Sequence, residues 1–274
     1  MRKSIYLVII AMLIISESCA VKRNSGTLVR LETTYGEITL RLYPETSKHH
    51  DNFVKLVNKG FYNGVLFHRV IAGFMIQAGD PASKTAKPGV LLGDGDVGYT
   101  VPAEFIYPKY YHKRGALAAA RESDASNPSK ASSGCQFYIV EGKIFSDNGL
   151  DSIETSKKEK LEVKLFQQIV NTRQNEVKEY QAEGSQSKLD GLRDSILTVV
   201  RAGMEKTKSY KLTPQQRADY KTLGGTPHLD GEYTVFGEVT EGLEIVERIS
   251  KAKTGNNNRP VEDIKVIKAE IINK

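Results

Sequence analysis

The spacing of apolar residues changes twice along this chain, and that change limits the folds it can adopt. Short apolar runs bounded by glycine, such as "GFMIQAG" (73–79) and "GCQFYIVEG" (134–142), have the length and residue types of β-strands. Between about Ser146 and Thr222 these signals disappear, and apolar residues recur every three or four positions. The pattern predicts a β domain interrupted by a helical segment.

The parts outside the interruption predict a closed antiparallel barrel with helical caps. Residues 27–45 alternate apolar and polar on both sides of Tyr35-Gly36, which is typical of a β-hairpin. Residues 46–60, with Thr46 or Ser47 as the cap, and residues 241–250 have the period of amphipathic helices. Residues 261–272 predict a closing strand. Many short strands with two helices favour a mainly β fold, a closed antiparallel barrel.

The interrupting segment, residues 146–222, predicts an αα-hairpin followed by a short helix. Two apolar stripes at helical spacing are separated by Gly184-Ser185, and each helix spans about 20 residues, or roughly 30 Å. Thr213 as N-cap, Pro214 at the first position and Gln216 completing a capping box predict the third helix. A hairpin returns the chain near its start, so the β domain of residues 27–274 need not be strained by it.

The first residues have the form of a secretory signal, predicted to end at residue 18. A positive start precedes an apolar run from Ile5 to Ile15, which is too short to span a membrane comfortably. The "SESC" that follows resembles the cleavage site of bacterial lipoproteins. It predicts a lipid on Cys19 and a tether over residues 19–26. An ordinary signal peptide and an uncleaved anchor are the alternatives, and each places the chain in the cell envelope, outside the cytoplasm.

The charge and the cysteine count exclude some classes of protein. The net charge of +6 is mild for 274 residues, and the charges are interspersed. Without a basic stripe that alternates with aromatic residues, the sequence favours a solvated surface over nucleic-acid binding. The two cysteines are Cys19 and Cys135, so a lipidated Cys19 leaves no disulfide framework. Cys135 enters an apolar strand and is expected to be a small buried thiol.

The stretch "FHRVIAGFMIQAGD" (67–80) places Arg69 and Gln77 among large apolar side chains. Charged and amide groups are rarely buried without partners. A lone arginine in such a setting is most often a surface group whose stem covers apolar neighbours. A pair of polar groups beside Phe74 and Met75 instead suggests the polar edge of an apolar pocket.

Four separated segments resemble the cyclophilin-type peptidyl-prolyl isomerases. They are "FHRVIAGFMIQAGD", "GALAAAR", "CQFYIV" and "HLDGEYTVFGEV", within a likeness that covers about residues 28–141 and 226–273. The resemblance implies an eight-stranded antiparallel barrel capped by two helices, with a shallow peptide cleft on its side. It implies rotation of X–Pro bonds in proline-containing polypeptides or unfolded protein clients, with no metal or cofactor. The helical insertion and the signal segment lie outside it.

The resemblance also assigns roles to matching positions. Arg69 matches the catalytic arginine, and Gln77 matches an amide that orients Arg69 or the substrate. The other matching positions are expected to bind substrate. Phe74, Met75 and Leu229 match the walls of the proline pocket, and Gln136 matches a second amide. Ala120 and Arg121 match a segment whose backbone pairs with the substrate, and Tyr138, His228 and Tyr233 stand where the family often has Phe, Trp and His. These last three departures bear on substrate preference and on sensitivity to cyclosporin-type inhibitors.

The expected chemistry requires few groups. An X–Pro bond rotates slowly because amide resonance opposes the twist, and a fixed donor beside the nitrogen favours the twisted state. Arg69 suits this task because guanidinium is always charged and donates several hydrogen bonds. Two other functions stay open: a module that binds proline peptides or acts as a chaperone without turnover, and a coiled-coil scaffold. The insertion either extends the contact with a client at the cleft rim or is a packed elaboration without a binding role.

Overall fold

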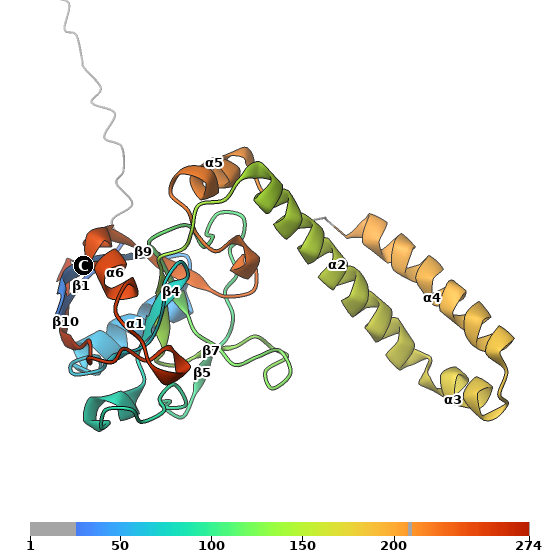
Figure 1. Ribbon diagram of the computed structural model, residues 1–274, viewed down its shortest axis with the longest axis horizontal. Helices are drawn as coiled ribbons and strands as arrows, with labels where there is room; N and C mark the ends of the chain where they lie inside the picture. Colours follow the sequence, from blue (N-terminus) through green and yellow to red (C-terminus); the bar gives the residue numbers. More distant parts are fainter. Residues whose placement is uncertain (1–25, 208–209, 274) are drawn as a thin grey trace, which may run out of the picture.

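An eight-stranded antiparallel sheet forms the body of the molecule (Figure 1). The computed structural model describes residues 26–207 and 210–273. The strand order is β10-β1-β2-β9-β6-β8-β4-β3, and β5 and β7 form a separate two-stranded sheet. The strands are β1 (Leu28–Thr33), β2 (Gly36–Leu42), β3 (Phe67–Ile71), β4 (Met75–Ala78), β5 (Thr100–Val101), β6 (Ala116–Ala119), β7 (Ser132–Ser133), β8 (Phe137–Val140), β9 (Val235–Glu241) and β10 (Val266–Asn273).

The two edges of this sheet meet, which gives the sheet its barrel shape. Backbone hydrogen bonds run from Gly64 N to Val266 O at 2.7 Å and from Val266 N to Val65 O at 2.8 Å, so the chain leading into β3 pairs with β10. The predicted hairpin of residues 27–45 is confirmed as β1 and β2, which pair from Leu28 and Arg41 to Thr33 and Gly36. The mainly β barrel predicted from the sequence is therefore confirmed.

Two helices, α1 (Ser47–Asn58) and α6 (Leu243–Ser250), pack their apolar faces on the barrel interior. The start of α1 differs from the sequence expectation. Thr46 stands at the N-cap but its hydroxyl donates to Tyr43 O. The carboxylate of Glu104 accepts the backbone N–H groups of Lys48 and His49 instead, at 3.1 and 3.0 Å. A distant acidic side chain thus caps the helix, where a negative charge also suits the helix dipole.

The insertion is the predicted helical hairpin, followed by the predicted short helix. Its helices are α2 (Asp147–Thr172), α3 (Gln174–Ala182), α4 (Gln186–Lys206) and α5 (Pro214–Thr222). Gly184 makes the turn with a φ of 61°, and Thr213 and Gln216 form the predicted capping box. The break at Arg173, which divides α2 from α3, was not predicted.

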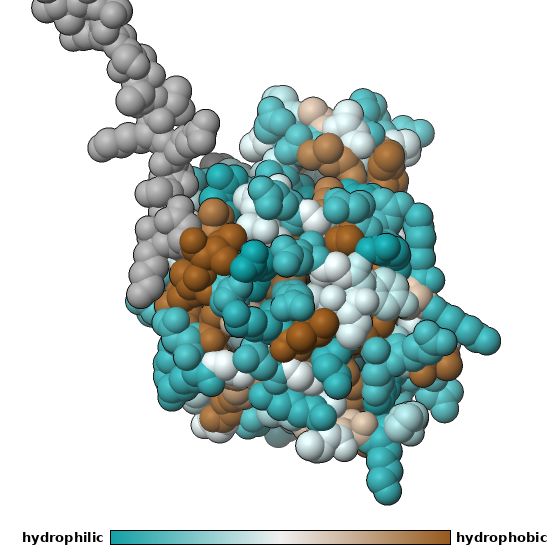
Figure 2. Space-filling model, turned by 90° about the vertical axis from the view of Figure 1, so that its left-hand side faces the viewer, coloured by the Kyte–Doolittle hydropathy of each residue, from teal (hydrophilic) through white to brown (hydrophobic). Residues whose placement is uncertain are grey.

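The insertion has two parts (Figure 1). The base, formed by the start of α2 and by α5, is joined to the barrel. The arm, formed by the rest of α2 with α3 and α4, extends away from it. The arm has an apolar cluster of its own around Leu192, Ile196 and Val200. A second cluster at the base, with Leu150, Leu212 and Tyr220 buried, also includes Tyr111 from the loop before β6. Separate clusters mean that arm and base are held by different contacts. The face of the molecule opposite the arm is mostly hydrophilic, with apolar side chains in small separate groups (Figure 2).

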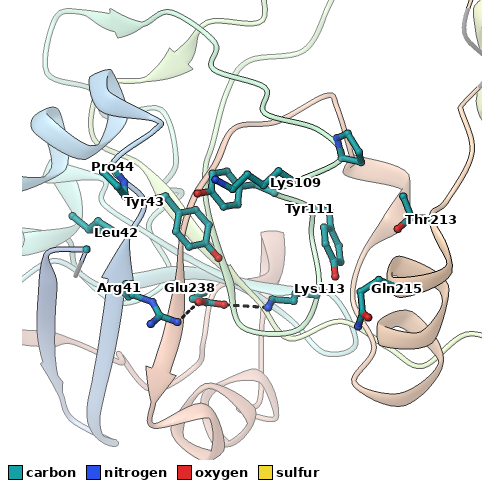
Figure 3. A pocket seen from close by; sticks show the side chains of 13 residues that line it. Arg41, Leu42, Tyr43, Pro44, Lys109, Tyr111, Lys113, Thr213, Gln215 and Glu238 are labelled. Atoms are coloured by element: carbon teal, nitrogen blue, oxygen red, sulfur yellow. Dashed lines mark hydrogen bonds and ion pairs between the residues drawn. The ribbon is translucent and has the colours of Figure 1, made fainter. Parts of the chain in front are cut away.

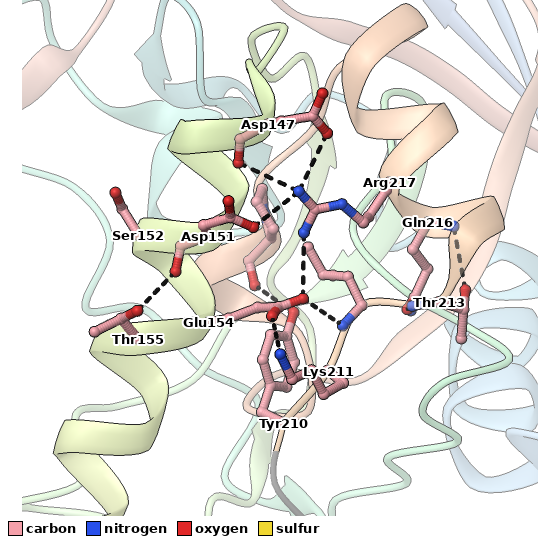
Figure 4. Close-up of polar contacts among 12 residues, drawn as sticks. Asp147, Asp151, Ser152, Glu154, Thr155, Tyr210, Lys211, Thr213, Gln216 and Arg217 are labelled. Atoms are coloured by element: carbon pink, nitrogen blue, oxygen red, sulfur yellow. Dashed lines mark hydrogen bonds and ion pairs between the residues drawn. The ribbon is translucent and has the colours of Figure 1, made fainter.

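Ion pairs at the base fix α2 against α5. Arg217 of α5 contacts Asp147, Asp151 and Glu154 on one face of α2, at 3.1, 2.9 and 3.4 Å (Figure 4). These three acids follow the spacing i, i+4 and i+7, which places them on one helix face. The two ends of the insertion also pair, since Gly225 N donates to Lys143 O at 3.0 Å. The base is therefore a fixed extension of the barrel.

Candidate active site

A row of side chains crosses four neighbouring strands on the outer face of the barrel. Arg69 of β3 lies opposite Gln77 of β4, and Gln77 lies opposite Tyr138 of β8. Tyr138 in turn lies opposite Ala118 of β6. Directly opposed residues in antiparallel strands share one face of the sheet. The register therefore brings the predicted catalytic pair beside a predicted wall of the proline pocket.

The period of two along each strand separates this row from the barrel core. Ile76, Leu117 and Ile139 are neighbours of the row in sequence, and they point into the main core. Ala118 and Tyr138 of the row belong to a second apolar cluster, which lies outside the barrel wall, and Arg69 and Gln77 border this cluster. Its members are Met75, Ala116, Ala118, Tyr138, Val140 and Val235, with Phe74, Ala120, Leu229 and Tyr233 packed against them.

A pocket of about 250 Å³ opens over this second cluster. Among the residues predicted to form the site, it is lined by Arg69, Phe74, Met75, Gln77, Ala120, Arg121, Tyr138, Leu229 and Tyr233. Gln136 and His228 do not line it. Gln136 lies behind Gln77, and His228 is exposed with its ring 5.6 Å from that of Phe74. The structure thus brings the predicted residues together at one place, with these two at its margin.

A chain of hydrogen bonds fixes the orientation of both amides. Arg69 Nη1 donates to Gln77 Oε1 at 3.2 Å, and Gln77 Nε2 donates to Gln136 Oε1 at 3.0 Å. Gln136 Nε2 then donates to the carbonyls of Gly93 and Gly95, at 2.7 and 2.8 Å. Arginine can only donate and a carbonyl can only accept, so neither amide can flip without losing bonds at both ends. The chain holds the Arg69 guanidinium in place, 6.0 Å from the centroid of the Phe74 ring.

Most polar groups of Ala120 and Arg121 already have partners within the protein. Ala120 N donates to Gln136 O at 3.0 Å, and Ala120 O accepts from Ser133 N at 2.8 Å. The Arg121 side chain is buried, with its guanidinium 4.4 Å from the centroid of the Tyr233 ring. Because Ala120 N is already bonded, substrate pairing at this segment would use the second lone pair of Ala120 O or the backbone of Arg121.

Tyr138 presents its ring to the pocket and its hydroxyl to the interior. The hydroxyl lies 2.9 Å from Nε2 of His112, whose Nδ1 lies 3.0 Å from the Asp230 carboxylate. Since a carboxylate accepts, Nδ1 donates, and in the neutral imidazole Nε2 accepts from Tyr138. Burial raises the pKa of Tyr138 well above its ordinary value, so the ring stays neutral. It is a rigid, uncharged pocket wall.

Sequence reasoning missed several residues that line the pocket, namely His68, Leu92, Gly93 and Asp94. His68 is 2% exposed, and among the described residues neither of its ring nitrogens has a hydrogen-bond partner. Burial lowers its pKa, which favours the neutral ring. Strict alternation along β3 would turn His68 away from Arg69, but the register shifts between Phe67 and Arg69. Such a bulge redirects side chains, and no sequence signal marks it.

A larger pocket, of about 490 Å³, lies between the barrel and α5 (Figure 3). It shares no lining residue with the pocket that contains Arg69. Each cation in its lining is paired with an acidic side chain. Arg41 and Lys113 both reach Glu238, at 2.5 and 3.1 Å, and Lys109 reaches Glu45 at 2.5 Å. The smaller pocket is therefore the candidate active site.

Comparison with known proteins identifies the family. The model of the family "Cyclophilin type peptidyl-prolyl cis-trans isomerase/CLD" matches residues 28–155 and 220–271. The chain belongs to the cyclophilin-type peptidyl-prolyl cis-trans isomerases. A peptidyl-prolyl cis-trans isomerase of Staphylococcus saprophyticus is 30% identical to this cyclophilin over 244 residues, which are 88% of this chain and 90% of the relative. The enzyme class implied by the sequence resemblance is thus confirmed.

Other similar proteins differ more in length or sequence. A bifunctional phosphatase/peptidyl-prolyl cis-trans isomerase of Streptococcus pyogenes is 27% identical over 257 residues. This alignment spans 91% of our chain but only 40% of that relative. Among solved structures, a cyclophilin of Cryptosporidium parvum matches 90% of the chain, and 98% of its own, with a TM-score of 0.51 and 19% identity. At that identity the structural match supports the fold alone.

Proposed function

We propose that this cyclophilin isomerises X–Pro bonds in protein clients of the cell envelope, and that Arg69 is its catalytic residue. The observation that supports the role of Arg69 is its position. It stands at the edge of an apolar pocket, held by Gln77 and packed near the ring of Phe74. The proposed ligand is a proline-containing peptide. A cyclophilin of C. parvum with the same fold was solved in the presence of the dipeptide Ala-Pro.

The proposed mechanism is preferential binding of the twisted amide. Rotation of an X–Pro bond has a barrier of roughly 18–20 kcal/mol because it breaks amide resonance. In the twisted state the lone pair is localised on the proline nitrogen and can accept a hydrogen bond. The bond from Arg69 to Gln77 uses one of five guanidinium N–H groups, which leaves others for the substrate. Lowering the barrier by about 4 kcal/mol would accelerate rotation about a thousandfold.

The apolar walls complete this mechanism by holding the proline ring still. Met75 of β4, Tyr138 of β8 and Leu229 of the turn before β9 come from separate elements and line one pocket. A fixed ring makes the preceding carbonyl the part that turns. Aromatic rings give flat walls, and a methionine adapts to the ring shape. No nucleophile, metal or proton transfer is required by this scheme.

The test is Arg69→Ala, assayed on a short peptide with one Ala-Pro bond. Turnover should fall at least a hundredfold, whereas peptide affinity, measured by titration, should change less than about fivefold. Arg69→Lys is the matched control, because it keeps the charge but loses the planar set of donors, and we expect it to recover only part of the rate. Full turnover by Arg69→Ala would refute the role of Arg69. A wild type that binds the peptide but does not accelerate rotation above the uncatalysed rate would favour a module that binds proline peptides without catalysis.

The location in the cell envelope is a separate part of the proposal. The predicted signal peptide (1–18), lipidation site (Cys19) and most of the tether (19–26) lie outside the described residues. No helix within residues 26–207 and 210–273 is long and apolar enough to cross a membrane. Mass spectrometry of the mature N-terminus tests the lipid directly. Cys19→Ser should move the protein from the membrane fraction to the soluble fraction, and an unchanged distribution would contradict the anchor.

The arm of the insertion is proposed to extend the contact with protein clients. Deleting the whole insertion would not test this, because its base also contacts the barrel. Residues 166–202 can be replaced by a short Gly-Ser linker, since a Cβ on Gly203 would lie 3.7 Å from Leu165 of the opposite helix. We expect the shortened chain to isomerise a short peptide normally and to assist refolding of a protein less well. Equal effects on both substrates would contradict a client-binding arm.

A further inference from the structure

Asp230 is a buried carboxylate on which the barrel and the insertion converge. Its side chain has 0% exposure. Oδ1 accepts from His112 N at 2.8 Å and from Nδ1 of the same residue at 3.0 Å. Oδ2 accepts from the hydroxyls of Tyr220 and Tyr210, at 2.7 and 3.2 Å. One oxygen is therefore held by the barrel and the other by the insertion.

The barrel side of this carboxylate leads directly to the pocket. His112, which bonds Oδ1, also bonds the hydroxyl of the pocket wall Tyr138. Leu229, another wall, precedes Asp230 in the chain. Leu229 ends a single 3-10 turn, Pro227–Leu229, whose own backbone bonds are few. Such a short turn is weakly stable alone, so its side-chain anchors determine where Leu229 lies.

The insertion supplies most of those anchors. The hydroxyl of Tyr210 also lies 3.3 Å from Pro227 O, so its single proton is shared between that carbonyl and Oδ2 of Asp230. Lys157 of α2 donates to Asp230 O at 2.5 Å, and its Nζ lies 4.5 Å from the centroid of the Tyr210 ring. The ion pairs of Arg217 hold α2 in place one helical turn before Lys157 (Figure 4). The turn that carries Leu229 is thus bonded at both of its ends to a rigid base.

We propose that the base of the insertion is a positioning element for the proline pocket, in which Tyr210 and Tyr220 hold Asp230 and thereby set the position of Leu229. Lys157 and Tyr210 lie outside the residues that the family model matches, and Tyr220 lies at its boundary. The inference concerns these added residues, and it rests on the proposed pocket being the substrate site. None of the three touches the substrate in this scheme.

The hydroxyls can be removed one at a time without removing the rings. Tyr210→Phe and Tyr220→Phe each take a donor from Asp230, and a buried carboxylate that loses a donor shifts toward the remaining ones. We expect KM for a peptide with one Ala-Pro bond to rise about three- to tenfold, with kcat within about twofold of the wild type. Tyr180→Phe is the matched control, because Tyr180 lies in α3 on the arm and should leave both constants unchanged.

A double-mutant cycle identifies the route of the effect. If Tyr220 acts through Leu229, then Tyr220→Phe should add little to KM in a Leu229→Ala background. Additive effects would overturn the proposed route. Wild-type KM in both single variants, with thermal unfolding showing them folded at the assay temperature, would overturn the proposal and leave Tyr210 and Tyr220 as stability residues only.

Arg69→Ala in the same assay separates this inference from the proposed function. If Arg69→Ala is inactive and the tyrosine variants match the wild type, the pocket is the active site and only the positioning role is wrong. If Arg69→Ala keeps full turnover, the proposed site itself is wrong.

Discussion

The surroundings of Lys157 lead to a prediction about how the free energy of unfolding depends on pH. Its side chain lies partly buried between Asp230 and the ring of Tyr210. Burial is the largest influence and lowers the pKa of Lys157 from 10.5 to about 8, against the opposing attraction of Asp230; Lys160 and Lys130 lower it slightly further. The charged amine is therefore less stable in the folded chain than in water.

The sign of the pH dependence follows from this lowered pKa. Between pH 8 and about 10.5 the unfolded chain keeps the proton on Lys157 and the folded chain has lost it. The free energy of unfolding rises with pH wherever the unfolded state binds more protons. A lowering of the pKa from 10.5 to about 8 corresponds to about 3–4 kcal/mol at most. Because the side chain is partly exposed to solvent, we expect about 1–2 kcal/mol.

The perturbation is Lys157→Met, which keeps most of the unbranched side chain and removes the titrating group. Urea unfolding of both proteins at pH 7, 8, 9 and 10 gives the difference in free energy of unfolding at each pH. Between pH 7 and pH 10 the free energy of unfolding of the wild type should rise by about 1–2 kcal/mol relative to that of the variant. The difference at a single pH is no test, because methionine also loses the hydrogen bond to Asp230 O.

Lys164→Met provides the control, because Lys164 lies seven residues further along α2, is exposed and is not among the charges that act on Lys157. Its unfolding free energies should follow those of the wild type at every pH. If the curves of the wild type and Lys157→Met stay parallel within about 0.5 kcal/mol, the amine is not disfavoured in the fold and the reasoning is refuted.

Three further predictions test other contacts. Burial raises the pKa of Glu104, but the ring of His49 and two backbone N–H groups outweigh it and hold the pKa below its ordinary value. Glu104→Gln should therefore cost about 1–2 kcal/mol at pH 7, a loss that shrinks below about pH 4 in acid unfolding. Gln136→Leu removes the acceptor of Gln77 and the donor to two backbone carbonyls, so turnover should fall about tenfold and thermal stability should also fall. Unchanged kinetics would contradict the amide chain. Gly225→Ala would place a Cβ against the main-chain oxygen of His112, so the free energy of unfolding in urea should fall by at least about 3 kcal/mol. A smaller loss would show that the backbone at the base can shift to accommodate the methyl group.

The parts of the site that the sequence predicted are those that follow from a period of two. Arg69 and Gln77 lie in strands joined by a short turn, so their register brings them opposite each other. Alternation also assigns Met75 and Gln77 to the pocket and Ile76 to the core. The resemblance added which face carries the chemistry, since periodicity alone would have made Phe74 and Met75 ordinary core residues.

The parts that the sequence did not predict depend on contacts between distant residues. Glu104 caps α1 from 55 residues away, and a local cap at Thr46 is what sequence rules favour. His68 faces the pocket because of a bulge, which one extra residue creates without a sequence signal. Asp230 collects donors from His112 and from the insertion, and no spacing rule relates positions 112, 210 and 230. Tertiary contacts outweigh local patterns at each of these positions.

The place of the insertion in the chain explains why its base can act on the pocket. It begins after β8, which carries Tyr138, and ends shortly before the turn that carries Leu229. Because Lys143 and Gly225 pair at its two ends, a segment inserted there must leave and re-enter the barrel between two walls of the same pocket. The arm, held by its own apolar cluster, has no such constraint on its length. KM for a short peptide should therefore depend on Tyr210 and Tyr220 at the base, and it should stay constant when residues 166–202 are shortened.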